Sequence, residues 1–393
     1  MGKAPVSAAT TISNVTAQAV SLSPQAQISL LTSSPSDDYV YTLYGHTALR
    51  VYDPDARIDL VYNYGIFDFS KPNFIYRFAK GETDYILAAY DFRYYIEEYI
   101  ERGSEVCEQV LNLLPEEKES LWQALELNRR PENRVYRYNF FFDNCATRPV
   151  VMIENSISGT IEYAYQKGGA IPTFRDAINN CTRNHPWVTF GCDLVLGMPT
   201  DHIMTFEETF FLPHYLKDAF DKAEIVRSDS APEPLIKETK ILSYKADAAD
   251  PESSFLSSPF FCFIMLFAFL SVLTVIELKG KRYYRLVDCI LFFAAGMAGC
   301  VMFFLNFMSV HPSMFPNISL LWLHPFHLIG VIFFSVKTFN KMAFWYHFIN
   351  FAAIFGMSVV WFFVPQHFNI AFFPLIAAFL LRSGGALIRK YLS

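Results

Sequence analysis

The chain has 393 residues, enough for two domains, and 52% of them are hydrophobic, with 40 phenylalanines. Its formal net charge of −6, and the lack of a run of Lys and Arg, argue against a nucleic-acid partner. The hydrophobic residues concentrate after residue 258, which indicates a membrane protein.

The N-terminal segment, residues 1–19, is rich in Ser, Thr and Ala and lacks the apolar stretch of a signal peptide. Its end, Thr16–Ala19, resembles a signal-peptidase site. We interpret the segment as a signal remnant or a tag, with an ordinary disordered tail as the alternative.

A hairpin is predicted next. Gln27–Thr32 is a candidate strand, and Thr47–Val51 alternates apolar and polar residues as a half-buried strand does. Asp53–Asp55 is a turn, and Ile58–Tyr64 is the following strand, which Gly65 is expected to end.

His46 lies at the head of this hairpin. Folding at about residue 55 places Asn63 or Tyr64 opposite it, and a neutral amide or hydroxyl there would fix the tautomer of a catalytic imidazole. Asp68 is a third candidate for that role. A satisfied structural histidine is the alternative interpretation.

The elements that follow mix helices and strands. Strands are predicted at Tyr85–Tyr90, Ser104–Leu113 and Arg134–Phe142, helices at Pro115–Asn128 and Phe174–Asn180, a loop with a short helix at Phe67–Gly81, either type at Phe92–Arg102, and a linker at Ser228–Ser258. This order predicts an α+β arrangement, in which a small antiparallel sheet packs on helices.

A cysteine stands at the predicted boundary between a strand and a helix, in YNFFFDNCATRP. Asp143 or Asn144 would cap a helix over Ala146–Ile157, so Cys145 would lie in its first turn. Free N–H groups there favour a thiolate and could hold an oxyanion, and Arg148 adds positive charge. A buried, inert cysteine is the alternative.

These motifs carry a family resemblance. A histidine on a strand, a second strand, and then Asn-Cys opening a helix resemble the circularly permuted NlpC-like branch of the papain-like fold, which includes lecithin–retinol acyltransferase. The segments YGHTALRV, YNYGIFDF, KPNFIYRFAKGETDY, FFFDNCATRP and NISLLWLHPFHL are similar to those of the Lnb-type lipoprotein N-acyltransferases of Bacteroides relatives. The resemblance covers most of residues 25–390 and implies that a diacylated lipoprotein accepts the acyl chain.

Apolar segments of spanning length fill the last part of the chain. We predict five spans, at Phe260–Ile276, Leu286–Met308, Ile318–Val336, Ala343–Val364 and Phe368–Leu387. Pro374 leaves four or six spans as alternatives. The predicted fold is therefore a permuted papain-like (NlpC-like) extracytoplasmic domain over residues 20–258, followed by a bundle of about five transmembrane helices over residues 259–393.

Loop charges predict the orientation. Lys and Arg follow the first, third and fifth spans, whereas the loops after the second and fourth carry none, which places the C-terminus in the cytoplasm and residues 20–258 outside. We expect a multi-pass protein of a bacterial inner membrane with a periplasmic catalytic domain. His311, Asn317, His324 and His327 then fall on the side of Cys145, where they line a path for lipid headgroups or form an interfacial belt.

Two further patterns concern cysteines and metals. Cys181 and Cys192 flank a loop of about ten residues and would form a disulfide or remain free thiols. Asp201–His202 and Pro213–His214 lack the spacing of a metal site, so neither a metal nor a cofactor is expected.

The leading functional hypothesis is a thiol acyltransferase. His46 would activate Cys145, Asn63 would orient His46, and a phospholipid would donate the acyl chain. Substrate contacts are expected from Tyr64, Asn144, Arg148, His324 and His327. The alternatives are a membrane-anchored cysteine hydrolase, either a peptidoglycan peptidase or amidase or a phospholipase, and a non-catalytic membrane scaffold.

Overall fold

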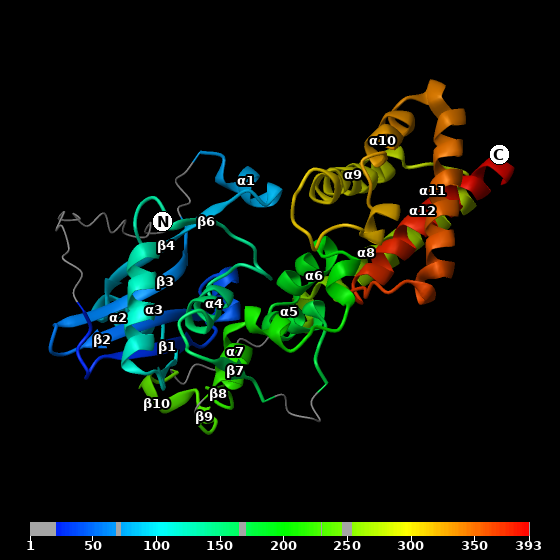
Figure 1. Cartoon of the computed structure of the whole chain (residues 1–393). Coiled ribbons are helices and arrows are strands. Elements are labelled where there is room, and N and C mark those ends of the chain that lie inside the picture. The colour runs from blue at the N-terminus through cyan, green and yellow to red at the C-terminus, as the bar shows by residue number, and fades with distance from the viewer. Residues whose placement is uncertain (1–20, 68–71, 165–169, 229, 246–253, 393) are drawn as a thin grey trace.

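The computed structural model describes residues 21–67, 72–164, 170–228, 230–245 and 254–392. Figure 1 shows a part built on a β-sheet, followed by a bundle of long helices that ends at the C-terminus. The predicted tail at residues 1–19 and the candidate Asp68 lie outside the described residues.

The larger sheet has seven strands in the order β10-β5-β1-β2-β3-β4-β6, and each neighbouring pair is antiparallel. Its strands are β1 (Gln27–Ser33), β2 (His46–Asp53), β3 (Ile58–Ile66), β4 (Asp84–Asp91), β5 (Val106–Leu111), β6 (Val135–Arg137) and β10 (Ile236–Ser243). A smaller sheet joins β7 (Thr160–Glu162), β8 (Glu224–Val226) and β9 (Glu233–Pro234).

The helices of the first part are short. They are α1 (Phe74–Lys80), α2 (Phe92–Glu101), α3 (Pro115–Asn128), α4 (Thr147–Glu154), α5 (Phe174–Thr182), α6 (Pro186–Val195) and α7 (Pro213–Phe220). Sheet and helices together confirm the α+β prediction, and the predicted helix at Pro115–Asn128 has the bounds of α3.

Successive side chains of the central strands point to opposite faces of the sheet, where they pack into two apolar layers. Leu30 and Tyr62 pack with Leu121 of α3. Their neighbours Leu31 and Val61 point to the other face and pack with Tyr95 of α2. Because both faces are covered, the centre of the sheet is rigid and can position side chains at its edge.

The strand before the cysteine is shorter than predicted. It ends at Arg137 and not at Phe142, because the Asn139 side-chain oxygen accepts hydrogen bonds from the backbone N–H groups of Phe141 and Phe142. This turn draws Phe141 out of the sheet and into an aromatic contact with Phe174.

The linker prediction at Ser228–Ser258 was wrong in part. Ile236–Ser243 forms the edge strand β10, which pairs with β5 from Ile236–Leu111 to Ser243–Val106. Its polar composition reflects the exposed face of an edge strand. Residues 246–253 lie outside the described residues.

The C-terminal helices are α8 (Pro259–Gly280), α9 (Arg285–Phe307), α10 (His327–Ser335), α11 (Asn340–Val360) and α12 (Phe372–Leu392). Among the described residues, four helices are long and apolar enough to cross a membrane: α8, α9, Lys337–Val360 and Phe372–Lys390. The predicted third span is divided into a 3₁₀ turn at Ile318–Leu321 and the short α10, because Pro325 interrupts helical hydrogen bonding between them. Pro374 stands in the first turn of α12 and does not break it.

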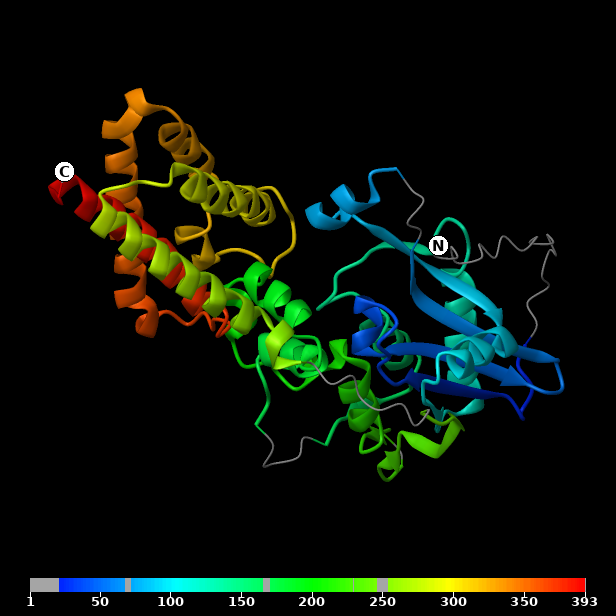
Figure 2. The same cartoon turned by 180° about the vertical axis from the view of Figure 1, so that it is seen from behind.

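Polar contacts tie the bundle to the first part. The Asn317 side chain donates to the carbonyl oxygens of Leu194 (2.9 Å) and Leu196 (3.2 Å) at the end of α6. On another side, the Val310 N–H donates to the Lys80 carbonyl oxygen of α1 (2.9 Å). Both views place α6 between the sheet and the bundle (Figures 1 and 2).

Candidate active site

His46 is oriented by an amide two positions away on the neighbouring strand. The β2–β3 register runs from Leu49–Tyr62 to Asp53–Ile58, so Asn63 falls on the same face of the sheet as His46. His46 Nε2 lies 2.6 Å from the Asn63 side-chain oxygen. The Asn63 amide nitrogen donates to the Tyr90 hydroxyl (2.8 Å), which turns the amide oxygen toward the imidazole.

The sheet opens where His46 lies. Beyond Leu49–Tyr62, β2 remains paired with β1 through His46–Ser33, while β3 remains paired with β4 through Ile66–Ile86. The ladder between β2 and β3 therefore ends, and their last residues diverge. This opening leaves room for a side chain from another segment.

Cys145 occupies that opening, beside Gly65 of β3. A methyl group built on Gly65 would lie 3.5 Å from the Cys145 Cβ and 3.8 Å from the His46 Cε1. Gly65 has a φ of 95°, a conformation that other residues rarely adopt, and it lies at the irregularity in β3–β4 pairing. It continues β3 and does not end it, which corrects the prediction.

A tight turn presents the thiol. Cys145 is not in the first turn of α4, as predicted, but two residues before its start at Thr147. Asn144 is buried, and its side-chain oxygen accepts from the N–H groups of Ala146 (2.8 Å) and Thr147 (3.0 Å). Its amide nitrogen donates to Phe140 and Phe211 carbonyl oxygens, so Asn144 caps the helix and anchors the turn.

This cap changes which N–H groups are available near the sulfur. Those of Ala146 and Thr147 are engaged by Asn144, whereas the N–H groups of Cys145 and Thr47 approach the Cys145 sulfur. Two donors, one from the turn and one from β2, therefore stabilise negative charge on the sulfur.

The electrostatics favour a thiolate–imidazolium pair. Burial opposes charge on Cys145, but the adjacent His46 and the two backbone N–H groups outweigh it and lower the pKa of the thiol. Burial likewise opposes charge on His46, but Cys145 and Asn63 outweigh it and raise the pKa of the imidazole. Neither residue as a whole is fully buried.

Tyrosines form the surroundings of the thiol. The Tyr85 and Tyr138 rings stack with centroids 4.0 Å apart. Burial, followed by the Cys145 thiolate, raises the pKa of Tyr85 to about 12 and also raises the pKa of Tyr138. Both hydroxyls remain neutral at physiological pH and add no competing charge.

Three predicted substrate contacts have structural roles here. The Tyr64 hydroxyl donates to the Asn128 side-chain oxygen (2.7 Å) and the residue is buried. Arg148 forms two hydrogen bonds with Asp143, at 2.5 and 2.8 Å, and lies over the Tyr136 ring. The contacts of Arg148 hold the turn before α4. Direct substrate contact by Tyr64, Asn144 or Arg148 stays a prediction.

His324 and His327 belong to the helical bundle. Their rings stack with centroids 4.0 Å apart, and His327 is buried between the Trp322 carbonyl oxygen and the Tyr346 hydroxyl. Among the described residues no hydrogen bond joins either histidine to Cys145. Their substrate role also stays a prediction.

Cys181 and Cys192 are free thiols in this structure. Cys181 lies in α5 and Cys192 in α6, and the Cys192 sulfur lies 3.9 Å from the Tyr44 hydroxyl. The disulfide alternative is therefore not the arrangement observed.

Three contributors were not predicted from the sequence. Gly65 leaves room for His46 and Cys145 beside it, Tyr90 orients Asn63, and Thr47 supplies an N–H group. Tyr90 could have been found, because it shares the strand parity of the residues that face α2. Thr47 could not, because its contact depends on where the ladder opens.

An α+β domain that carries a cysteine–histidine–asparagine cluster is thus joined to helices long and apolar enough to span a membrane, which is the architecture of a membrane protein. The family model of the Lnb N-terminal periplasmic domain matches residues 16–180, and that of the Lnb transmembrane domain matches residues 250–392. The chain belongs to the Lnb family, and it is a membrane protein of lipoprotein maturation with a periplasmic domain. No curated protein and no solved structure matched it.

Proposed function

We propose that the protein transfers a fatty acyl chain from a phospholipid, through a thioester on Cys145, to the N-terminal amine of a diacylated lipoprotein. The observation that carries this proposal is the His46–Cys145 pair, oriented by Asn63, at the open end of the β2–β3 ladder. The family membership supports lipoprotein maturation as the setting.

The first half-reaction loads the enzyme. The Cys145 thiolate attacks the ester carbonyl of the phospholipid, and the Cys145 and Thr47 N–H groups donate to the oxyanion. The bond between the carbonyl carbon and the glycerol oxygen then breaks. The His46 imidazolium gives its proton to that oxygen, and a lysophospholipid leaves.

The second half-reaction transfers the chain. The lipoprotein amine attacks the thioester carbonyl, a C–N bond forms, and the C–S bond breaks. Neutral His46 takes the proton from the attacking amine, which restores the imidazolium beside the thiolate. Asn63 holds Nε2 throughout, so the other ring nitrogen faces the reacting groups.

The membrane attachment suits two lipid-anchored substrates. We propose that the site faces the periplasm at the inner membrane and that the C-terminus is cytoplasmic. The contacts of Asn317 with α6 and of Val310 with α1 support this orientation, because these loops join spans at the end of the bundle nearest the first part. Charged Lys281, Arg285 and Arg389 lie at the other end.

The test is the intact mass of the purified full chain after incubation with phospholipid vesicles. We expect a mass gain of one fatty acyl chain that hydroxylamine removes. Cys145→Ser should abolish it, and His46→Ala should slow it at least about 100-fold, since general acid–base catalysis contributes about that much or more. Cys181→Ser is the matched control and should load normally.

Adding a diacylated lipopeptide separates the candidate reactions. Transfer of the chain to the peptide amine, with release of free enzyme, supports the acyltransferase. Release of free fatty acid alone, with an unmodified peptide, would establish a hydrolase. Absence of any adduct with all donors would rule out the thioester mechanism.

A further inference from the structure

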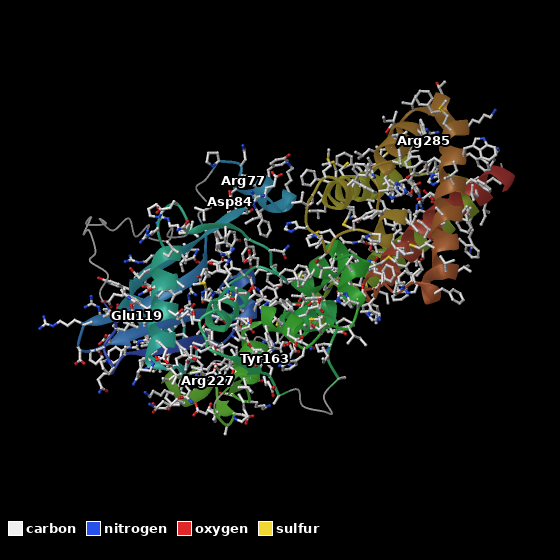
Figure 3. All side chains as sticks on the ribbon, in the orientation of Figure 1. Arg77, Asp84, Glu119, Tyr163, Arg227 and Arg285 are labelled. Atoms are coloured by element: carbon white, nitrogen blue, oxygen red, sulfur yellow. The ribbon has the colours of Figure 1, made fainter. Side chains whose placement is uncertain are left out.

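A cavity lies at the end of the bundle away from the first part (Figure 3). It has a volume of about 490 Å³ and opens among the ends of α8, α9, α11 and α12. Six of its lining residues are cationic: Lys281, Arg282, Arg285, Lys341, Arg389 and Lys390. Its lining contains neither Asp nor Glu. Figure 3 shows Arg285 at the end of the bundle away from the first part.

The nearby buried carboxylates do not neutralise this charge. Glu277 and Asp288 are fully buried behind the cavity, and both pair with Arg382, at 2.8 and 2.6 Å. Glu277 also pairs with Arg389 (2.7 Å). Two carboxylates therefore balance two guanidinium groups, and they do not balance the positive charge of Lys281, Arg282, Arg285 and Lys341.

Three of these residues are not held by an acidic partner. Within the described part of the chain, Lys281, Arg282 and Lys341 form no ion pair, and all three are exposed. Arg285 donates to the Phe334 carbonyl oxygen and to the Asn340 side chain, which are neutral acceptors. The cavity is therefore strongly electropositive.

A buried histidine in the wall points to a ligand independently of this charge. His347 lines the cavity and is only 2% exposed. Its Nδ1 lies 3.3 Å from the Ser383 hydroxyl, whereas its Nε2 has no hydrogen-bond partner among the described residues. Buried polar atoms are almost always satisfied, so a polar group from outside the chain would complete this site.

Four apolar residues, Leu278, Ala343, Phe344 and Ala386, also line the cavity beside the cations. A free inorganic anion would leave this surface exposed, whereas a lipid would place its headgroup among the cations and its chains along these residues. We propose that this cavity binds the phosphate headgroup of an anionic phospholipid in the leaflet opposite the catalytic domain. The site is separate from the acyl-transfer site and does not depend on that chemistry.

The test is native mass spectrometry of the full chain in detergent, titrated with phosphatidylglycerol or with zwitterionic phosphatidylethanolamine. We expect wild-type protein to retain phosphatidylglycerol with at least about tenfold preference. The double variant Arg282→Gln/Lys341→Gln should weaken that binding about tenfold or more, because each cation near the surface contributes substantially. Lys341→Gln alone, at an exposed position, should show an intermediate loss.

The chain offers a matched control at the same end of the bundle. Lys279 and Lys337 are exposed and do not line the cavity, so Lys279→Gln/Lys337→Gln removes the same charge and should leave lipid retention unchanged. Equal loss in both double variants would reduce the effect to general surface charge and overturn the proposal. Equal retention of the two lipids, or full displacement by inorganic phosphate, would also overturn it.

Discussion

At the scale of single residues, the opposite pKa shifts of Cys145 and His46 are the feature that separates this site from an ordinary buried cysteine. The thiol has a lowered pKa and the imidazole a raised one, and both shifts favour the charged pair over the neutral pair. The protein contains its own contrast, since burial raises the pKa of Cys181 to about 11.

This contrast predicts two different pH midpoints for alkylation by iodoacetamide, followed peptide by peptide. The Cys145 rate should rise with pH through a midpoint below the ordinary value of 9.0, because its pKa is lowered, and the Cys181 midpoint should lie near 11. His46→Gln removes the imidazolium and should move the Cys145 midpoint upward. Coincident midpoints in wild-type protein, or an unmoved midpoint in the variant, would contradict the ion pair.

The sequence motifs were sufficient to identify His46 and Cys145 as candidate catalytic residues, but not to predict how their side chains lie relative to each other. Strand parity distinguishes Asn63 from Tyr64, since Asn63 shares the His46 face and Tyr64 points into the core with Leu121. Gly65 depends on a positive φ and an irregular register, and neither has a signature in a single sequence beyond the glycine itself.

At the scale of elements, α1 is unusual because none of its residues is buried. Ile75 is 82% exposed and Phe78 is 49% exposed. Tyr76 lies with its ring centroid 5.7 Å from that of Phe304 in the spanning helix α9. The exposed apolar side chains of α1 thus lie next to a helix of spanning length, as expected for an interfacial helix at the bilayer surface.

We therefore expect α1 to matter when the acyl donor sits in a bilayer. Ile75→Asp/Phe78→Asp should slow thioester formation from phospholipid vesicles about tenfold, because two apolar contacts with the bilayer are replaced by charges. Loading from a monomeric short-chain phospholipid should be unchanged. Leu127→Asp is the control, since Leu127 is 52% exposed on α3. Equal slowing by the control, or with both donors, would contradict this role.

The helices and strands were predicted correctly where periodic apolar residues determine the structure. They were predicted wrongly where side-chain hydrogen bonds or pairing between distant strands determine it. Pro115–Asn128 was predicted in full, because its Pro start and apolar stripe are local signals. The end of β6 depends on the Asn139 turn, and β10 depends on pairing with β5 across more than a hundred residues. Local composition carries neither signal.

At the scale of the whole molecule, a buried arginine joins the two parts. Arg175 in α5 pairs with Asp201 (2.7 Å) and Asp193 (3.3 Å). Asp193 also accepts from the Asn369 side chain (2.8 Å), and Asp201 from the His367 N–H (3.2 Å), both in the loop before α12. The same carboxylates thus serve the first part and the bundle.

Arg175→Ala should lower stability by about 3–5 kcal/mol, because it leaves two carboxylates buried without their cation. The expected readout is a marked fall in the unfolding temperature of the full chain in detergent. Arg137→Ala is the comparison, since Arg137 is 53% exposed in its pair with Asp84 and should contribute less than about 1 kcal/mol. Similar shifts for both variants would show that Arg175 does not join the parts.

The position of β10 at the sheet edge has a consequence for biosynthesis. Chains emerge from the N-terminus, so β5 presents an open row of backbone groups until Ser243 has been made, and the first spanning helix starts at Pro259. The sheet is completed only about sixteen residues before the chain is committed to the bilayer. The β5 edge is therefore covered only shortly before membrane insertion begins, and the nascent domain needs protection from aggregation until β10 has paired.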